Sequence, residues 1–177
     1  MKKNLLMNSD DINQAISKIS ENLLKSIKEF HNVCFVGIRT RGITVAKRIL
    51  SELNKNEINN IPLGTLDITL YRDDFRSKDT WPVIEKTDIE FDVDNKDIII
   101  VDDVIYTGRT ARAAIEAIMD YGRPSSIKLI TLIDRGNREL PIQPDFNGAK
   151  FDVAEGSRVN VFLEDIDGKE GVELTTD

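Results

Sequence analysis

The sequence IIIVDDVIYTGRT, residues 98–110, decides the fold of this chain. Its first four residues are apolar and β-branched, which predicts a strand buried on both faces of a sheet. Asp102 and Asp103 follow, then the turn Thr107–Thr110, and then a helical pattern that ends at Gly122. A buried strand, an acid pair and a turn at the start of a helix predict a ligand site at the carboxyl end of that strand.

The turn Thr107–Thr110 has the composition of a phosphate-binding loop. Backbone N–H groups at a helix N-terminus, two threonine hydroxyls and the guanidinium of Arg109 together favour a phosphate monoester. Gly108 allows the backbone to approach that phosphate closely. Asp102 and Asp103 are acceptors suited to the vicinal hydroxyls of a sugar or to a hydrated cation. A phosphate beside a diol indicates a phosphorylated ribose.

Two common nucleotide-binding motifs are missing from the sequence. It contains neither the GxxxxGK[ST] pattern of a P-loop nor the GxGxxG pattern of a dinucleotide fold. An apolar strand that ends in two acids could mimic a Walker B element or a phospho-acceptor site, but neither explains the Thr-Gly-Arg-Thr turn that follows. A purely structural role, in which the acids cap a turn, stays open on this pattern alone.

The segments before this stretch predict a helix, a strand and a second helix. Apolar residues recur every three or four positions over 12–30, which predicts a helix capped by the Ser-Asp pair before it. The apolar run Val33–Ile38 predicts a strand buried on both faces. A basic turn, Arg39–Gly42, follows this strand, and residues 43–53 have a helical pattern.

The remaining segments complete an α/β pattern. Residues 66–71 predict a strand, and residues 72–87 predict a long functional loop because they mix charges without a period. Residues 127–133 and 159–163 predict later strands, with the charged loop 134–139 between them. Strands that alternate with helices predict one α/β domain, with a mostly parallel central sheet flanked by helices. Ligands of such sheets bind beyond the carboxyl ends of the strands.

Composition excludes several classes of protein. The 177 residues carry 24 Lys and Arg against 31 Asp and Glu, a net charge of -7 that disfavours nonspecific binding to nucleic acid or to anionic membranes. Eight of the acids lie in residues 151–177, so the charge does not by itself exclude an RNA surface. One cysteine, Cys34, and one histidine, His31, exclude multi-thiolate zinc sites and sites with two imidazoles. The sequence predicts no signal peptide and no membrane span, so we expect a cytoplasmic protein.

Residues 98–110 resemble the PRPP-binding motif of the type I phosphoribosyltransferases. The resemblance implies the type I phosphoribosyltransferase fold as a single domain over residues 1–177, with a flexible lid loop at about 72–90, a small hood at about 134–165 and an acidic tail at 164–177. It also implies that Asp102 and Asp103 bind the ribose hydroxyls of PRPP and that the turn after them binds its 5'-phosphate. The implied PRPP-binding residues are Asp102, Asp103, Val104, Ile105, Tyr106, Thr107, Gly108, Arg109 and Thr110.

The same resemblance assigns roles to the other loops. The residues that match the family's pyrophosphate loop are Arg39, Thr40, Arg41 and Gly42, and two arginines suit a diphosphate. The residues expected near the nucleobase in the hood are Asp134, Arg135, Gly136 and Val159. The implied catalytic set is Arg39, Arg41, Arg72, Asp102 and Asp103.

Five collinear blocks resemble one group of this family, the pyrimidine-operon attenuation regulators that are also uracil phosphoribosyltransferases. The blocks, VGIRTRG, DITLYRDD, VDDVIYTGRTARA, GRPSSI and DRGNRELPI, lie between Val36 and Ile142. The resemblance implies that uracil and PRPP give UMP and pyrophosphate, with Mg²⁺ held through PRPP and water and by no direct protein ligand. Tyr106 stands where purine-salvage relatives commonly have an acid, so we expect a pyrimidine substrate.

Regulators of this group bind pyrimidine-operon leader mRNA through a basic face, with uridine nucleotides such as UMP or UTP as effectors. This chain has Glu21, Asn137 and Gln143 where histidine or basic residues are usual. The remaining candidate RNA contacts, which could equally be ordinary solvated surface, are Lys18, Lys25, Arg138 and Lys150.

Two hypotheses from different classes therefore stand. The first is an enzyme that makes UMP without RNA regulation, and the second is a nucleotide-sensing RNA-binding regulator that keeps the transferase site chiefly as a sensor. A phosphoribosyltransferase for a purine or for orotate, without an RNA-binding function, is the alternative reading. We expect a homodimer or a higher homo-oligomer.

Overall fold

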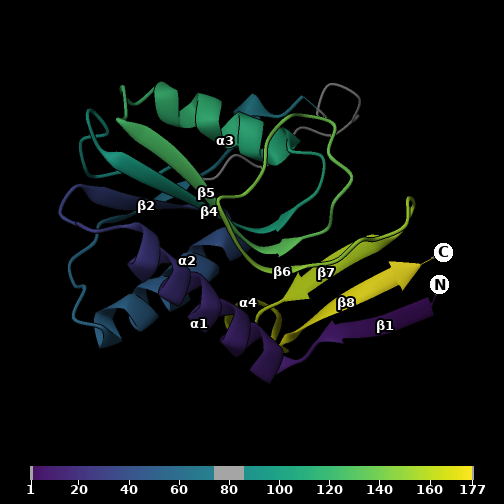
Figure 1. The fold of residues 1–177 in the computed structure, drawn as a ribbon. Helices are drawn as coiled ribbons and strands as arrows, with labels where there is room; N and C mark the ends of the chain where they lie inside the picture. Colours follow the sequence, from purple (N-terminus) through teal and green to yellow (C-terminus); the bar gives the residue numbers. More distant parts are fainter. Residues whose placement is uncertain (1, 74–85, 177) are drawn as a thin grey trace.

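The computed structural model describes residues 2–73 and 86–176 (Figure 1). Five parallel strands form the central sheet, in the spatial order β3-β2-β4-β5-β6. The strands are β2 (Val33–Ile38), β3 (Leu63–Leu66), β4 (Asp97–Ile105), β5 (Ser126–Asp134) and β6 (Phe146–Lys150). Because these strands all run the same way, the loops that follow β2, β4 and β5 meet at one edge of the sheet.

Helices cover both faces of this sheet (Figure 1). The helices α1 (Ser9–Ser26) and α2 (Arg41–Lys55) pack on one face, and α3 (Arg109–Met119) packs on the other with the short 3-10 helix η1 (Thr69–Tyr71) beside it. Phe35 and Ile99 point into the core under α1 and α2, whereas Val36 and Ile100 point into the core under α3. Burial on both faces explains why these strands are continuous apolar runs.

A second, antiparallel sheet, here called the hood sheet, contains β1 (Lys2–Met7), β8 (Gly171–Thr176) and β7 (Arg158–Phe162), in that order. The one-turn helix α4 (Glu164–Asp167) connects β7 to β8. The hood sheet thus joins the two ends of the described chain, and Figure 1 shows the termini side by side. The segment expected as an acidic tail belongs to the fold, because it forms α4 and the central strand of the hood sheet.

Most elements lie where the sequence predicted them, and two predictions need correction. Residues 66–71 are not a strand: β3 comes earlier, at Leu63–Leu66, and its half-buried and buried positions alternate. The strand predicted at 98–101 continues to Ile105, so the acid pair lies within β4. The expected lid at about 72–90 falls largely on residues 74–85, outside the described residues. Beyond them, Asp88 forms a two-way backbone pair with Thr65, with both N···O distances 2.8 Å.

No helix of the described segments is long and apolar enough to span a membrane.

Candidate active site

A pocket of about 200 Å³ lies at the sheet edge where β4 ends. Its wall contains Asp102, the whole turn from Tyr106 to Thr110, and Arg72 at the end of η1. Thr131 of β5 faces the same pocket. The structure therefore brings together the acid pair and the phosphate-like turn, which the sequence placed in one site.

The turn before α3 is shaped as an anion site. Gly108, the N-cap residue of α3, has a φ of 92°, a left-handed conformation that favours glycine, and it has no side chain to cap the helix. The hydroxyl of Thr107 accepts from the N–H of Arg109 at 3.3 Å, and the next N–H groups of the helix have no side-chain acceptor among the described residues. The N–H groups of the first turn of a helix lack intrahelical partners, so an uncapped N-terminus attracts an anion. The carbonyl of Thr107 accepts hydrogen bonds from the N–H groups of Glu139 and Leu140, at 2.9 and 3.0 Å. These bonds fix the turn against the loop after β5.

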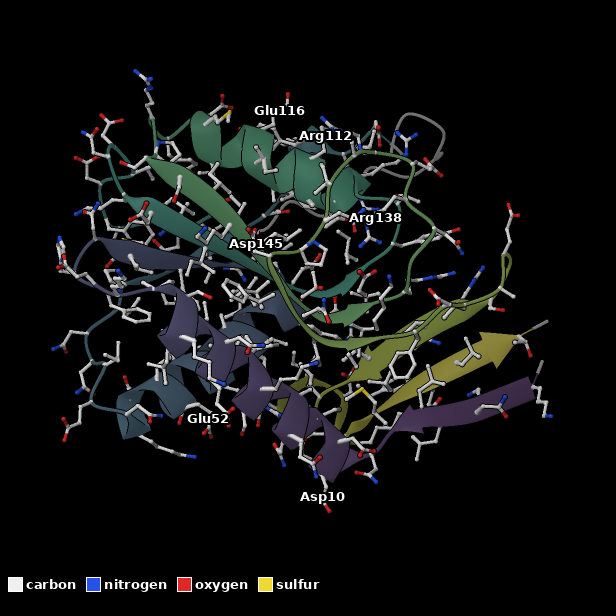
Figure 2. The ribbon with its side chains drawn as sticks, in the orientation of Figure 1. Asp10, Glu52, Arg112, Glu116, Arg138 and Asp145 are labelled. Carbon is white, nitrogen blue, oxygen red and sulfur yellow. The ribbon has the colours of Figure 1, made fainter. Side chains whose placement is uncertain are left out.

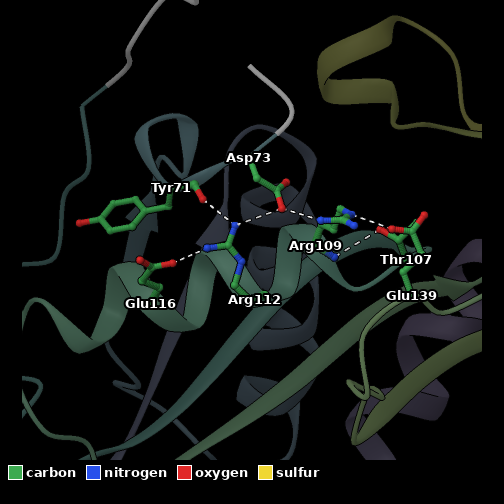
Figure 3. A network of polar contacts seen from close by, with 7 residues as sticks. All are labelled: Tyr71, Asp73, Thr107, Arg109, Arg112, Glu116 and Glu139. Carbon is green, nitrogen blue, oxygen red and sulfur yellow. Dashed lines mark hydrogen bonds and ion pairs between the residues drawn. The ribbon is translucent and has the colours of Figure 1, made fainter. Parts of the chain in front are cut away.

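The guanidinium of Arg109 is bound by two acidic side chains, those of Glu139 and Asp73 (Figure 3). Its Nε donates to Glu139 at 2.7 Å, and its Nη1 donates to Asp73 at 2.5 Å. Arg112 lies one turn further along α3, donates to the carbonyl of Tyr71 at 2.9 Å and pairs with Asp73 at 3.7 Å. Asp73 thus links the segment after η1 to the start of α3.

Asp102 and Asp103 form a closely coupled acid pair. Oδ1 of Asp102 accepts from the N–H of Asp103, and Oδ1 of Asp103 accepts from the N–H of Val104, both at 2.9 Å. Burial raises the pKa of both carboxyls, and the charge of Asp103 raises the pKa of Asp102 further. Two acids that resist simultaneous ionisation suit a ligand that brings hydroxyl donors or a cation.

Two glycines allow the basic turn after β2 to lie close to β4. A Cβ on Gly42 would collide with the carbonyl oxygen of Val101 and would lie 3.2 Å from Cα of Asp102. A Cβ on Gly37 would lie 2.6 Å from Cα of Ile43. The missing side chains let the start of α2 contact the end of β4, so the basic turn lies beside the acid pair. The peptide bond between Arg39 and Thr40 is cis.

The two arginines of this turn point in different directions. Nε of Arg39 donates to the carbonyl of Lys86 at 3.0 Å. Arg41 instead pairs with Asp167 of α4, through Nη2 to Oδ1 at 2.6 Å and through Nε to Oδ2 at 3.2 Å. This pairing raises the pKa of Arg41 and lowers the pKa of Asp167. The charge of Asp103 also raises the pKa of Arg41.

The loop after β5 contains two buried charged side chains. The carboxylate of Asp134 has hydrogen-bond partners, whereas two nitrogens of Arg135 have none in the described part of the chain. The carboxylate of Asp134 accepts from Nη2 of Arg138 at 2.8 Å and from the N–H of Gly136 at 2.9 Å. Arg135 is only 6% exposed, and its Nε and Nη2 are buried without a hydrogen-bond partner. Its guanidinium carbon lies 3.8 Å from the ring centre of Tyr106. Asp134 therefore shapes the loop, whereas Arg135 offers donors that still need an acceptor.

The residues suggested as RNA contacts differ in whether their charged groups are already bound within the protein. Arg138 lies between the start of α3 and the hood sheet (Figure 2) and donates to the carbonyls of Tyr106, Gly136 and Ile142, so its guanidinium is committed within the loop. Lys18 donates to the carbonyl of Gly148 at 3.1 Å.

Two further candidates for RNA, Lys25 and Lys150, are exposed, and Lys25 pairs with Glu21 at 3.7 Å.

Val159, which was expected near the nucleobase, lies on β7 opposite Leu174 of β8.

Comparisons with known proteins agree with this geometry. A family model described as "Phosphoribosyl transferase domain" matches residues 6–159. A relative from Microcystis aeruginosa, named "Bifunctional protein PyrR", is 45% identical over 170 residues, which cover 96% of this chain and 95% of the relative. Relatives of the same name from Caldicellulosiruptor bescii and Deinococcus radiodurans are 46% and 43% identical, covering 92% and 97% of this chain and 89% and 94% of the relatives.

The chain belongs to the PyrR family of phosphoribosyltransferases.

Solved structures agree with this assignment to the phosphoribosyltransferase fold. The chain is similar to the hypoxanthine phosphoribosyltransferase of Trypanosoma cruzi, with a TM-score of 0.73 at 13% identity, over 97% of this chain and 95% of that one. A hypoxanthine phosphoribosyltransferase from Staphylococcus aureus gives a TM-score of 0.72 at 19% identity, over 98% and 91% of the two chains. At such low identity these structures support the fold alone, so the base specificity of this PyrR-family chain depends on its own residues.

Three residues of this PyrR-family site were not found from the sequence. Thr131 interrupts an apolar strand, and its buried Oγ1 lacks a hydrogen-bond partner beside the pocket. A polar residue inside a buried strand was the available signal for it. Asp73 and Asp167 gave no signal, because their contacts with Arg109 and Arg41 join segments 36 and 126 residues apart.

Proposed function

We propose that this chain transfers the phosphoribosyl group of PRPP to N1 of uracil, giving UMP and pyrophosphate. One observation carries the proposal: Asp102 of the acid pair and the turn at the start of α3 line a single pocket. The pocket then holds the ribose hydroxyls at Asp102 and Asp103 and the 5'-phosphate at Thr107–Thr110. Membership of the PyrR family supports the choice of a pyrimidine base.

The proposed chemistry depends mainly on stabilising charge. As the bond from C1 to the pyrophosphate oxygen breaks and the bond from C1 to N1 of uracil forms, positive charge develops on the ribose ring and negative charge on the leaving group. Arg41 and Arg39, beside the ribose site, would bind that leaving group through charge-assisted hydrogen bonds. We assign no side chain as a general base.

The donor set fits Mg²⁺ that arrives with PRPP. The described residues contain no group of three His, Cys, Asp or Glu side chains that could hold a metal ion. Asp102 and Asp103 would reach Mg²⁺ through the ribose hydroxyls and water, which is how this ion commonly binds beside phosphate substrates. When bound, Mg²⁺ would neutralise charge on the pyrophosphate.

Arg135 and Tyr106 are the proposed base-recognition residues. The unpartnered Nε and Nη2 of Arg135 need acceptors, and a pyrimidine carbonyl oxygen would supply one. The test is pyrophosphate release from PRPP and Mg²⁺ with uracil, orotate, hypoxanthine and guanine in parallel. We expect turnover with uracil. Turnover only with orotate or a purine would refute this substrate and favour the alternative reading.

We also propose that the chain regulates pyrimidine genes by binding leader mRNA in the presence of uridine nucleotides. The name "Bifunctional protein PyrR" of its relatives supports two activities in one chain. Exposed Lys25 and Lys150 are the candidate phosphate contacts that keep a solvent-facing charge.

A gel-shift titration with a pyrimidine-operon leader RNA, with and without UMP, over a salt series tests this second activity. Binding should be enhanced by UMP and should weaken steeply with salt. A flat salt dependence, or no effect of UMP, would leave only the enzyme.

A further inference from the structure

The carboxylate of Asp167 is an anchored group on the hood side of the site. Oδ2 of Asp167 accepts from the N–H of Leu163 at 2.9 Å, and Leu163 is fully buried. Asp167 is the last residue of α4, and its side chain is only 15% exposed. A carboxylate fixed by a core backbone group is a rigid reference point for any cation that binds it.

Arg41 uses one edge of its guanidinium for this carboxylate. Its Nε and Nη2 donate to the two oxygens of Asp167, a bidentate arrangement that fixes the plane of the guanidinium. The other edge, formed by Nη1 and Nη2, donates to no further acceptor among residues 2–73 and 86–176. That edge is available for a phosphate oxygen.

A second arginine of α2 is held by the same segment. Arg48, seven residues after Arg41, pairs with both oxygens of Glu170 and lies 3.7 Å from Asp165. Residues 165–170 therefore bind α2 through two bidentate ion pairs, one next to the proposed pyrophosphate site and one about two helical turns away. Glu170 provides a matched control for Asp167, because each carries one negative charge and each binds one arginine of α2.

We propose that Asp167 is a positioning residue, which orients Arg41 so that its remaining edge faces the leaving pyrophosphate. The proposal rests on the proposed function in one respect, that Arg41 binds pyrophosphate. A long, flexible side chain loses much conformational freedom when it binds an anion, and Asp167 removes that freedom before the ligand arrives. Arg41 should then bind pyrophosphate more tightly with Asp167 present than without it.

This direction opposes the simple effect of charge. Asp167 is an anion near an anion site, so its loss through charge alone would strengthen pyrophosphate binding. Positioning predicts the reverse result, so the sign of the change distinguishes the two accounts.

The experiment measures calorimetric affinities of the full-length chain for Mg²⁺-pyrophosphate and for UMP, with the Tm of each variant. Asp167→Asn should weaken pyrophosphate binding by about 10-fold and lower kcat by a similar factor, since small misplacements of positioning groups have large effects. Its UMP affinity should stay within about 2-fold, because UMP lacks the pyrophosphate group. Glu170→Gln should lower the Tm comparably yet keep pyrophosphate affinity within about 2-fold, and Asp167→Glu should recover part of the loss.

Unchanged or tighter pyrophosphate binding by Asp167→Asn would overturn the positioning role. An equal loss in Asp167→Asn and Glu170→Gln would also overturn it, because the effect would then be general destabilisation. If wild-type chain binds pyrophosphate in an Asp167-dependent way but turns over no uracil, the proposed function fails while this inference stands. If wild-type chain binds no pyrophosphate, both fail.

Discussion

Buried ionisable side chains in this site have charges that the fold alone does not satisfy. Asp102 and Asp103 repel each other where burial already disfavours ionisation. Arg135 keeps two buried donors without acceptors. Each of these groups lowers the stability of the empty protein, and each offers a ligand the partner it lacks. The residues that destabilise the fold are thus the residues assigned to substrate.

Asp102→Asn should stabilise the fold at neutral pH and abolish turnover. The folded-state pKa of Asp102 is raised above its ordinary value of 3.8, so stability is lost as pH rises from that value through the raised pKa. The amide oxygen still accepts the bond from Asp103 and carries no charge. At pH 7 to 8 the variant should be more stable by about 1–2 kcal/mol. At acid pH the difference should vanish.

Thermal melts of both proteins from acid to neutral pH measure this difference. A variant that is less stable than wild type at neutral pH would show that the acid pair is satisfied in the empty protein.

Arg135→Met should separate stability from base recognition. Replacing a buried, unpaired charge by an apolar side chain should leave the free energy of unfolding unchanged or raise it by about 1 kcal/mol. The KM for uracil should rise by about 10-fold or more, because the carbonyl would lose its donors. Steady-state kinetics with uracil varied at fixed PRPP measures this, with the exposed Arg123→Met as control. An unchanged KM for uracil would remove Arg135 from the base site.

At the scale of elements, the site depends on where helices begin. The first turn of α2 contacts the end of β4 because Gly42 has no side chain, and α3 begins at a left-handed glycine without a side-chain cap. Each helix start is fixed by a glycine, and each follows a strand that ends at the same edge.

Gly42→Ala should therefore damage both the fold and the site. The added methyl group would collide with a backbone carbonyl, which cannot rotate away, so the start of α2 must move from β4. We expect a loss of about 2 kcal/mol or more in the free energy of unfolding and at least about 10-fold in kcat/KM. Denaturant melts and initial rates measure these, and Ala46→Gly in the same helix is a comparison for altered helix propensity. Wild-type rates for Gly42→Ala would mean that the basic turn does not contact the reacting centre.

The sequence predicted the elements whose signals are local. The apolar runs of β2, β4 and β5 and the helical spacing of α1, α2 and α3 depend on near neighbours in the chain. Residues 66–71 were misread because alternation there is as regular as in a strand, while pairing with β2 selected residues 63–66. β1, β6 and β8 escaped prediction because their sequences mix polar and apolar residues. β1 is largely exposed, and β6 and β8 are mostly half-buried, so none of them is a continuous apolar run.

The candidate site was likewise predictable only where its residues are near neighbours in the sequence. The acid pair, the turn before α3 and the basic turn each consist of consecutive residues. The partners of their arginines are not contiguous, since Asp167, Glu139 and Asp73 meet these arginines only in the folded chain. Charge alone did not predict the contacts of Arg138, whose guanidinium donates to the carbonyls of Ile142 and Tyr106.

At the scale of the whole molecule, several acidic side chains near the hood sheet stabilise the fold through ion pairs. The segment 164–173 forms α4 and the start of β8 (Figure 1), so its acids are not part of a solvated tail. Asp167 and Glu170 hold α2, and Glu173 pairs with Lys169 at 2.8 Å. The hood sheet is thus attached to the central domain partly by ion pairs and partly by the buried side chains of Leu163 and Val172.

Ending the chain after Glu170 should unfold the hood. This truncation removes β8, the central strand of the hood sheet, and exposes the pairing edges of β1 and β7. We expect a loss of at least about 3 kcal/mol in the free energy of unfolding, because fully buried Val172 leaves the core with the strand. Denaturant melts and limited proteolysis measure this, against a chain ended after Thr175. Equal stability of the two chains would show that β8 adds nothing to the stability of the fold.

The pairing of β1 with β8 also orders events during synthesis. Residues 2–7 leave the ribosome well before their partners, residues 172–176, which follow them by 165 to 174 residues. The central sheet, residues 33–150, can assemble before then, with its acid pair and phosphate turn already formed. Asp167 can reach Arg41 only after the whole central sheet has been synthesised, so in a nascent chain the acid pair and the turn before α3 can form before Arg41 is oriented.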